Sequence, residues 1–127
     1  MPEKKLYEYA VIRLVPKVER EEFINIGIIL FSKKANFIKV LVDIDEERLK
    51  LFSGEIDCNQ LRENLDAFER ISRGEHNAGP IAKEDLPSRF RWLTAIRSSM
   101  IQTSRPHPGK ADDLEVAAVQ LLKEYVG

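Results

Sequence analysis

The stretch that decides the fold is residues 7–30, with the sequence YEYAVIRLVPKVEREEFINIGIIL. Its first part, Tyr7–Val15, alternates side chains between two faces, as a β-strand does. Pro16 has no amide hydrogen for a sheet ladder, so we expect the strand to end there. A second strand, Ile24–Ser32, is largely apolar on both faces, which is typical of a central strand. Apolar surface accounts for both strands but not for the charged connection between them.

The residues after this stretch continue a sheet and then change period. A short turn and a third strand, Phe37–Ile44, predict an antiparallel hairpin with the second strand. The period then becomes helical, and four helices are expected to begin near Asp45, Asp57, Asp85 and Asp112, because aspartate is a favoured helix N-cap.

Further expectations concern the helices and the segment that follows the third helix. The third helix is expected to carry its apolar stripe from Phe90 to Met100, the segment Ile101–Ser104 is a candidate fourth strand, and residues 105–109 (RPHPG) are expected to form a turn. On the second helix, the spacing of four residues predicts ion pairs on a solvated face: Arg62 with Asp66, Asp66 with Arg70, and Glu69 with Arg73.

This order of elements predicts an α+β protein. We expect a mainly antiparallel sheet of three to four strands with about four helices, mostly on one face. Such an arrangement leaves the other face of the sheet partly open. Phe31, Phe37 and Leu41 would then be covered by a second copy of the chain, so the sequence suggests a homodimer.

Composition limits the class of protein. The 127 residues fit a single domain spanning residues 1–127, and 43% apolar content suits a globular core. The net charge of −1 gives no overall attraction to nucleic acid, which is therefore an unfavoured partner. A single cysteine, Cys58, cannot form an internal disulfide. The sequence shows no apolar leader and no apolar run near the roughly 20 residues that span a bilayer. We therefore expect a soluble cytoplasmic protein without a membrane association.

Arg13 is the first candidate for a functional role. It shares a strand face with Val11 and Val15, and a guanidinium in apolar surroundings needs a carboxylate, phosphate or carbonyl partner. The favoured interpretation is an internal salt bridge to a nearby glutamate, for which the sequence offers Glu8, Glu19 and Glu22. Binding of an external anion is the alternative.

The connection before the second strand is the second candidate. Glu19, Arg20 and Glu22 lie there, and Asn25 and Gly27 follow inside the strand. The simpler interpretation is a polar network that fixes the connection, in which Asn25 bonds to nearby backbone. The alternative is a small anion or nucleotide site with Arg13 and Arg20 as donors. Gly27 indicates a bulge or a close approach of another chain or a ligand.

Other residue types offer less. His76, His107 and Cys58 lack the spacing of metal ligands, and no glycine-rich phosphate loop is present, so we expect no metal or cofactor. Basic side chains surround Phe90 and Trp92 near the third helix, but helical projection scatters them, and ordinary solvation is the favoured interpretation. They are Arg89, Arg91, Arg97, Arg105 and Lys110.

The opening motif also carries a resemblance. The run YEYAVIRLVP from Tyr7, the later ER-x-EFINIGIIL from Glu19 and the TS-x-P-x-PG stretch at Thr103–Gly109 resemble a small bacterial family, the domain of unknown function 3037. The resemblance covers nearly the whole chain, with isoleucines at 24 and 26 where such proteins often show valine. The family has no established activity, so the resemblance implies no catalytic residues. Some similar proteins are encoded near kinase-like genes of the toxin–antitoxin type, and the resemblance thereby implies an accessory or partner-binding role.

Two functional hypotheses follow. The first, which we favour, is a non-enzymatic binding or accessory module that contacts a protein partner or a small anionic ligand through Arg13, Glu19, Arg20, Glu22 and Asn25. The alternative is a small hydrolytic or phosphoryl-handling enzyme, in which the arginines hold an anion and Glu19 or Glu22 acts as general base.

Overall fold

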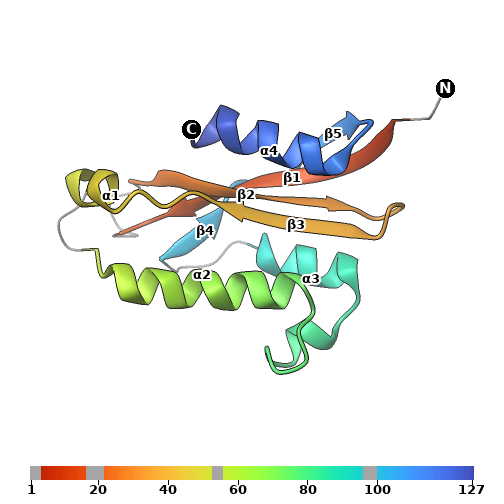
Figure 1. Cartoon of the computed structure of the whole chain (residues 1–127). Coiled ribbons are helices and arrows are strands. Elements are labelled where there is room, and N and C mark those ends of the chain that lie inside the picture. Colours follow the sequence, from red (N-terminus) through yellow and green to blue (C-terminus); the bar gives the residue numbers. More distant parts are fainter. Residues whose placement is uncertain (1–3, 17–21, 53–55, 96–99) are drawn as a thin grey trace.

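A computed structural model of the chain describes residues 4–16, 22–52, 56–95 and 100–127. It is an α+β fold with five strands and four α-helices in the described part, so the expected class is confirmed and the sheet is larger than the three to four strands expected (Figure 1). The elements are β1 Lys5–Leu14, β2 Ile24–Ser32, β3 Phe37–Val42, α1 Glu46–Phe52, α2 Cys58–Ser72, the 3-10 turn η2 Ile81–Lys83, α3 Leu86–Leu93, β4 Ile101–Thr103, β5 His107–Ala111 and α4 Leu114–Tyr125.

β1 lies at the centre of the sheet. Every pairing is antiparallel, and the order is β3-β2-β1, with β4 and β5 sharing the remaining edge of β1. β4 confirms the candidate fourth strand. The expected turn at residues 105–109 is wrong, because residues 107–109 belong to strand β5. Pro108 lacks an amide donor, which an edge strand tolerates. Gly109 lies against the ring of Tyr7, where a β-carbon would not fit.

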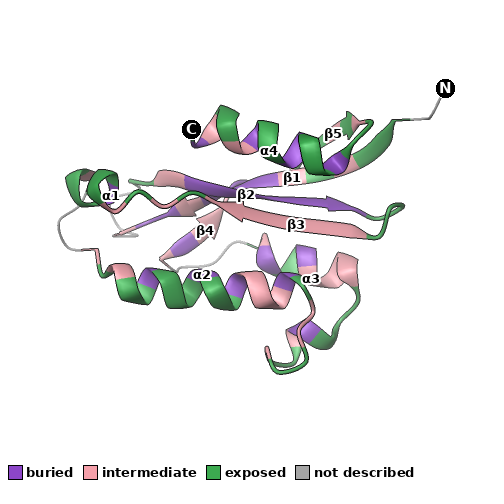
Figure 2. Ribbon diagram, in the orientation of Figure 1, coloured by how far each residue is buried: buried purple, intermediate pink, exposed green. Residues whose placement is uncertain are grey.

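Helices cover both faces of the sheet (Figure 1). On one face, α2 and α3 pack over Ala10, Ile12 and Leu14 of β1, and Leu49 of α1 joins the same cluster. On the other face, α4 packs over Ile28 and Leu30 of β2. Figure 2 shows buried residues along both β1 and β2, as expected for central strands between two layers.

The expectation of an open sheet face is therefore wrong. Phe37 and Leu41 pack against the cluster beneath α4, whereas Phe31 belongs to the cluster on the opposite side, where its ring stacks on Phe90 with centroids 4.8 Å apart. The expectation failed because the last helix crosses to the second face, which helical periodicity cannot reveal. The argument for a homodimer loses its basis in these side chains.

The helix starts were predicted well. Asp45, Asp57 and Asp85 accept backbone hydrogen bonds as N-caps of α1, α2 and α3. α4 is capped by Asp113, one residue later than the expected Asp112, and Asp113 Oδ1 accepts from the amides of the next helical residues. None of the described helices is long and apolar enough to cross a membrane.

The third helix is shorter than expected. α3 ends at Leu93, and Thr94 closes it by donating from both its amide and its hydroxyl to the carbonyl of Phe90. Met100 contacts the core from outside the helix, and its carbonyl accepts from Val15, so it already belongs to the segment that enters β4.

Candidate functional site

A β-bulge in β2 positions the candidate site. Ile12 pairs with Gly27, but the next residue of β1, Arg13, pairs with Asn25, which leaves Ile26 as an extra residue. A bulge of this kind turns the following side chains onto the opposite face. Strict alternation would place Ile26 beneath α4; instead it packs beneath α2 and α3. Asn25 is thereby turned toward α4, on the same face as Arg13.

Gly27 permits this irregularity. A β-carbon on Gly27 would lie 2.5 Å from the carbonyl oxygen of Leu41 and 2.8 Å from Val42 Cγ1. The expected bulge is confirmed, since Ile26, the residue before Gly27, is the extra residue. The segment that approaches Gly27 closely is β3 of the same chain, rather than the other chain or ligand that was expected.

Three polar residues form a row across adjacent strands. Arg13 of β1 lies between Asn25 of β2 and Gln102 of β4, its partners on either side. We call Asn25, Arg13 and Gln102 the polar row. The row lies at the end of the sheet where α4 terminates, and its residues are half-buried. A cation thus stands between two amide-bearing residues, a combination suited to an anionic or carbonyl group.

Arg13 has a charge without a carboxylate partner in the described part of the chain. Its Cζ atom lies 4.2 Å from the centroid of the Phe23 ring, within cation–π range, and its Nε atom is buried without a hydrogen-bond partner. Glu8 and Glu22 are exposed and form no ion pair with it, so the expected internal salt bridge is not formed with either. A buried donor without a partner is uncommon and calls for an explanation.

Asn25 connects the polar row to α4. Its Nδ2 atom donates to the carbonyl of Tyr125 at 3.1 Å, whereas its Oδ1 atom is buried without a partner among the described residues. The next carbonyl, that of Val126, accepts from Arg48 Nη1 at 3.0 Å. Two side chains therefore satisfy the last carbonyls of the helix, which otherwise lack partners. Within the described ranges, the row therefore has an unpaired donor on Arg13 and an unpaired acceptor on Asn25, at paired positions.

The structure brings together only part of the predicted set. Arg13 and Asn25 are neighbours, Glu22 is exposed with no contact to them, and Glu19 and Arg20 lie outside the described residues. Sequence reasoning missed Gln102 and Phe23. The amphipathic pattern could not reveal Gln102, because its place beside Arg13 depends on the pairing of β4 with β1. A phenylalanine directly after the charged connection, two residues before Asn25, was the available sequence signal for Phe23.

A cluster of aromatic rings occupies the middle of the same face. The hydroxyls of Tyr9 and Tyr125 are hydrogen-bonded at 2.8 Å, and the Tyr9 ring lies 5.6 Å from that of His107. The hydrogen bond to Tyr125 raises the pKa of Tyr9 to about 12. Burial raises the pKa of Tyr7 as well. The hydroxyls of Tyr7 and Tyr9 stay protonated at neutral pH, so neither serves as a base, and the bond between Tyr9 and Tyr125 fastens α4 to the sheet.

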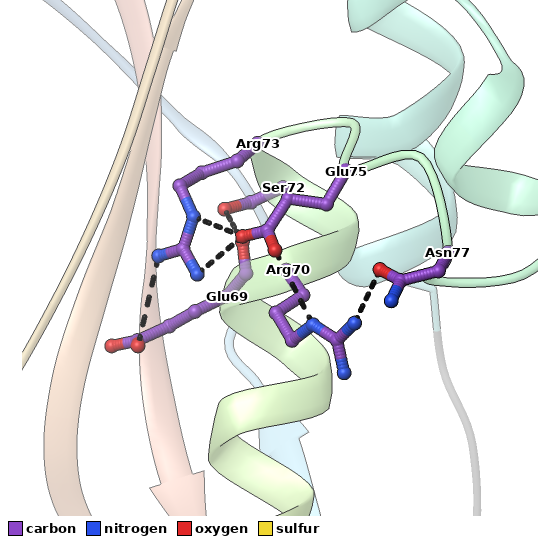
Figure 3. A network of polar contacts seen from close by, with 6 residues as sticks. All are labelled: Glu69, Arg70, Ser72, Arg73, Glu75 and Asn77. Atoms are coloured by element: carbon purple, nitrogen blue, oxygen red, sulfur yellow. Dashed lines mark hydrogen bonds and ion pairs between the residues drawn. The ribbon is translucent and has the colours of Figure 1, made fainter.

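A second polar cluster lies at the end of α2 (Figure 3). Arg73 contacts Glu69 at 3.9 Å and Glu75 at 2.6 Å, and Arg70 reaches both Glu75 and Asn77. The bond from Arg73 lowers the pKa of Glu75. These contacts are internally paired and brace the loop after α2.

The predicted pairs on α2 are correct only for Glu69 with Arg73. Arg70 instead reaches forward to Glu75, and Arg62 pairs with Glu46 of α1. Arg70 and Arg62 therefore each pair with a glutamate from a neighbouring segment instead of with Asp66 on their own helix. Across the described ranges, no three histidine, cysteine, aspartate or glutamate side chains gather to hold a metal ion.

Comparison with known proteins identifies the family. The model of the family described as protein of unknown function (DUF3037) matches residues 9–126. The match covers nearly the whole chain, so the chain belongs to this family, as its opening motif indicated. A search of the curated proteins and of the solved structures found no match.

Proposed function

We propose that this member of the family is a non-enzymatic binding module that holds an anionic group of a partner at the polar row. The ligand is a carboxylate or phosphate carried by a protein partner or a small molecule. Arg13 supplies the charge, the ring of Phe23 holds the guanidinium in place, and Asn25 Oδ1 accepts from an N–H or O–H donor elsewhere on the ligand.

One observation carries the proposal: the buried Nε atom of Arg13 has no partner in the described chain, on a side chain stacked against Phe23 at 4.2 Å. Leaving a buried donor unpaired costs about 1–3 kcal/mol. A ligand oxygen would recover that cost, and the planar guanidinium presents further donors to the same group. The unpaired Oδ1 of Asn25 adds an acceptor for a donor on the ligand.

The enzyme alternative has less support. It requires a general base close to the bound anion. Glu22 is exposed and forms no ion pair with Arg13, Glu19 lies outside the described residues, and Tyr9 keeps its proton far above neutral pH. A binding role needs no base and uses the groups that do lie together.

The test is direct observation of Arg13 by NMR. We would follow the Nε–H resonances of the arginines while sodium acetate or sodium phosphate is added at constant ionic strength. We expect a saturable shift of the Arg13 resonance and none for Arg62, which is exposed and already paired with Glu46. If neither anion moves the Arg13 resonance, the proposal is wrong.

A second experiment addresses the partner and the enzyme alternative. Tagged wild-type chain, Arg13→Met and the control Arg62→Met would be used for quantitative capture from the native host. We expect a protein retained by the wild type and the control but lost with Arg13→Met. Hydrolysis of p-nitrophenyl phosphate that disappears in Glu22→Gln would instead establish the enzyme.

A further inference from the structure

Five exposed lysines gather at the end of the sheet opposite the polar row. They come from the segment before β1, from β1 itself, from the turn between β2 and β3 and from β5 (Figure 1, beside the label N). We call them the lysine pole: Lys4, Lys5, Lys33, Lys34 and Lys110.

The fold fixes the segments that carry these lysines. Leu6 of β1 pairs with Lys110 of β5, so the neighbour of Leu6 in the chain, Lys5, is held close to Lys110. The hydroxyl of Ser32 donates to the carbonyl of Leu6 at 2.8 Å and accepts from the amide of Ala35 at 3.4 Å. These two bonds tie the turn with Lys33 and Lys34 to the beginning of β1.

The pole concentrates positive charge that the chain does not neutralise. Within the described residues, none of the five lysines forms an ion pair, whereas Lys39 on β3 pairs with Glu115. The chain has a net charge of −1, so the residues outside the pole carry −6. Like charges held together at one end repel one another, and an acidic ligand relieves that repulsion.

Two adjoining surface pockets lie within the pole and share Leu6 and Lys34. One has a volume of about 630 Å³ and is lined mainly by lysines, with Lys4, Lys5 and Lys110 on its walls. The other has a volume of about 440 Å³ and a mainly apolar surface formed by Leu6, Tyr7, Phe31 and Pro108, with Glu8, Lys33 and Lys34 also on its walls. Leu6 is 52% exposed, which is unusual for a leucine whose backbone is paired on a central strand.

We infer that the lysine pole binds a short acidic segment of a partner protein that carries one large apolar side chain. The apolar side chain occupies the pocket beside Leu6, and the acidic residues that follow it lie over Lys34, Lys5 and Lys110. The combination of a charged rim and one apolar pocket is the usual basis of peptide affinity and register.

A nucleic acid fits these observations less well. Single strands are held by exposed aromatic faces on which bases stack. Here the ring of Tyr7 is packed against Gly109, and Phe31 is 5% exposed. A long polyanion would also extend beyond the pole onto a surface whose net charge is −6. A short acidic peptide meets only the positive end.

This inference is independent of the polar row. Lys5 and Arg13 stand at opposite ends of β1, about 26 Å apart for eight residues of extended strand. Substitutions at one end are therefore expected to leave binding at the other unchanged, and each proposal fails on its own experiment.

Fluorescence anisotropy with a defined probe tests the inference. The probe is a fluorescein-labelled peptide of one phenylalanine followed by six glutamates, mixed with the full chain at low salt. We expect saturable binding that weakens as salt is added. The double variant Lys33→Glu/Lys34→Glu should weaken binding at least ten-fold. Both lysines are in an exposed turn, so the variant should fold, which circular dichroism would verify.

Three comparisons decide the outcome. Lys50→Glu/Lys123→Glu makes the same charge change on exposed helix positions away from the pole and should weaken binding less than three-fold. Replacing the phenylalanine of the probe by alanine should weaken binding of the probe to the wild-type chain several-fold. The inference is wrong if the probe does not bind at all or if the control variant loses as much affinity as the pole variant. It is also wrong if the alanine probe binds as tightly as the phenylalanine probe, or if labelled oligothymidylate of the same length binds more tightly.

Discussion

Beneath α2 and α3 the described residues form a cluster of thirteen buried side chains, all apolar, whereas the cluster beneath α4 has six. The second face adds half-buried polar groups to its smaller cluster: the hydroxyl pair of Tyr9 and Tyr125, and the polar row at Arg13 and Asn25. The first face provides most of the apolar burial that stabilises the fold. The second binds one helix with a smaller core and keeps room for polar side chains.

The largest expected effect tests the first face. Leu61→Ala removes a fully buried side chain of α2 and leaves a cavity between the helix and the sheet. We expect the free energy of unfolding to fall by about 4 kcal/mol, near the upper part of the range for buried leucines. Urea unfolding followed by circular dichroism measures it. A loss below about 2 kcal/mol would show that this face is not the dominant core.

The matched change on the second face is expected to cost less. Leu121→Ala removes a leucine of α4 that is 7% exposed, from a cluster with fewer buried members. We expect a loss of about 2–3 kcal/mol by the same measurement. A loss equal to that of Leu61→Ala would mean that the two faces contribute equally to the free energy of unfolding.

The two faces also differ in how far the sequence predicts them. The apolar stripe of α2 and the apolar side of β1 follow from periodicity, and the structure confirms Leu61, Leu65 and Phe68 as buried. The stripe of α4 was equally clear, but the face on which it packs was not. Periodicity defines which side of an element is apolar and carries no information on which sheet face that side covers.

The polar row was predictable only in part. Arg13 among valines was a sequence signal, because a cation in apolar surroundings requires a reason. Its meeting with Asn25 depends on the bulge at Ile26, which moves Asn25 to the other face. Gly27 hinted at such an irregularity, but a glycine does not specify which neighbour is displaced. β5 was not predicted, because proline and glycine usually indicate a turn. Pro108 and Gly109 are tolerated in β5 because it is an edge strand.

A smaller effect is expected at the tyrosine pair. Tyr125→Phe removes the hydroxyl that bonds to Tyr9 at 2.8 Å, and we expect a loss of about 1 kcal/mol at neutral pH. In the folded wild type the pKa of Tyr9 is about 12, above its ordinary value of 10.0. Because the folded state holds this proton more tightly, its stabilising contribution is complete below pH 10 and is lost as pH rises from 10 to 12.

The variant should therefore show a lower tyrosine pKa in an ultraviolet titration and a weaker dependence of stability on pH between 10 and 12. Tyr7→Phe is the control, since it leaves the bonded pair intact. An unchanged titration in Tyr125→Phe would mean that the hydrogen bond is not what raises the pKa of Tyr9.

The smallest expected effect concerns Arg13 and separates a binding site from a structural brace. Arg13→Met removes a cation–π contact with Phe23 that contributes about 0.5–1 kcal/mol, but it also removes the unpaired buried Nε atom, whose burial is unfavourable by about 1–3 kcal/mol. These contributions oppose each other, so we expect the free energy of unfolding to change by less than about 1 kcal/mol, with ligand binding lost. Asn25→Leu, which orphans the carbonyl of Tyr125, should cost more. If instead Arg13→Met destabilises the protein by more than about 2 kcal/mol, Arg13 stabilises the fold, and the argument that its guanidinium is available to a ligand fails.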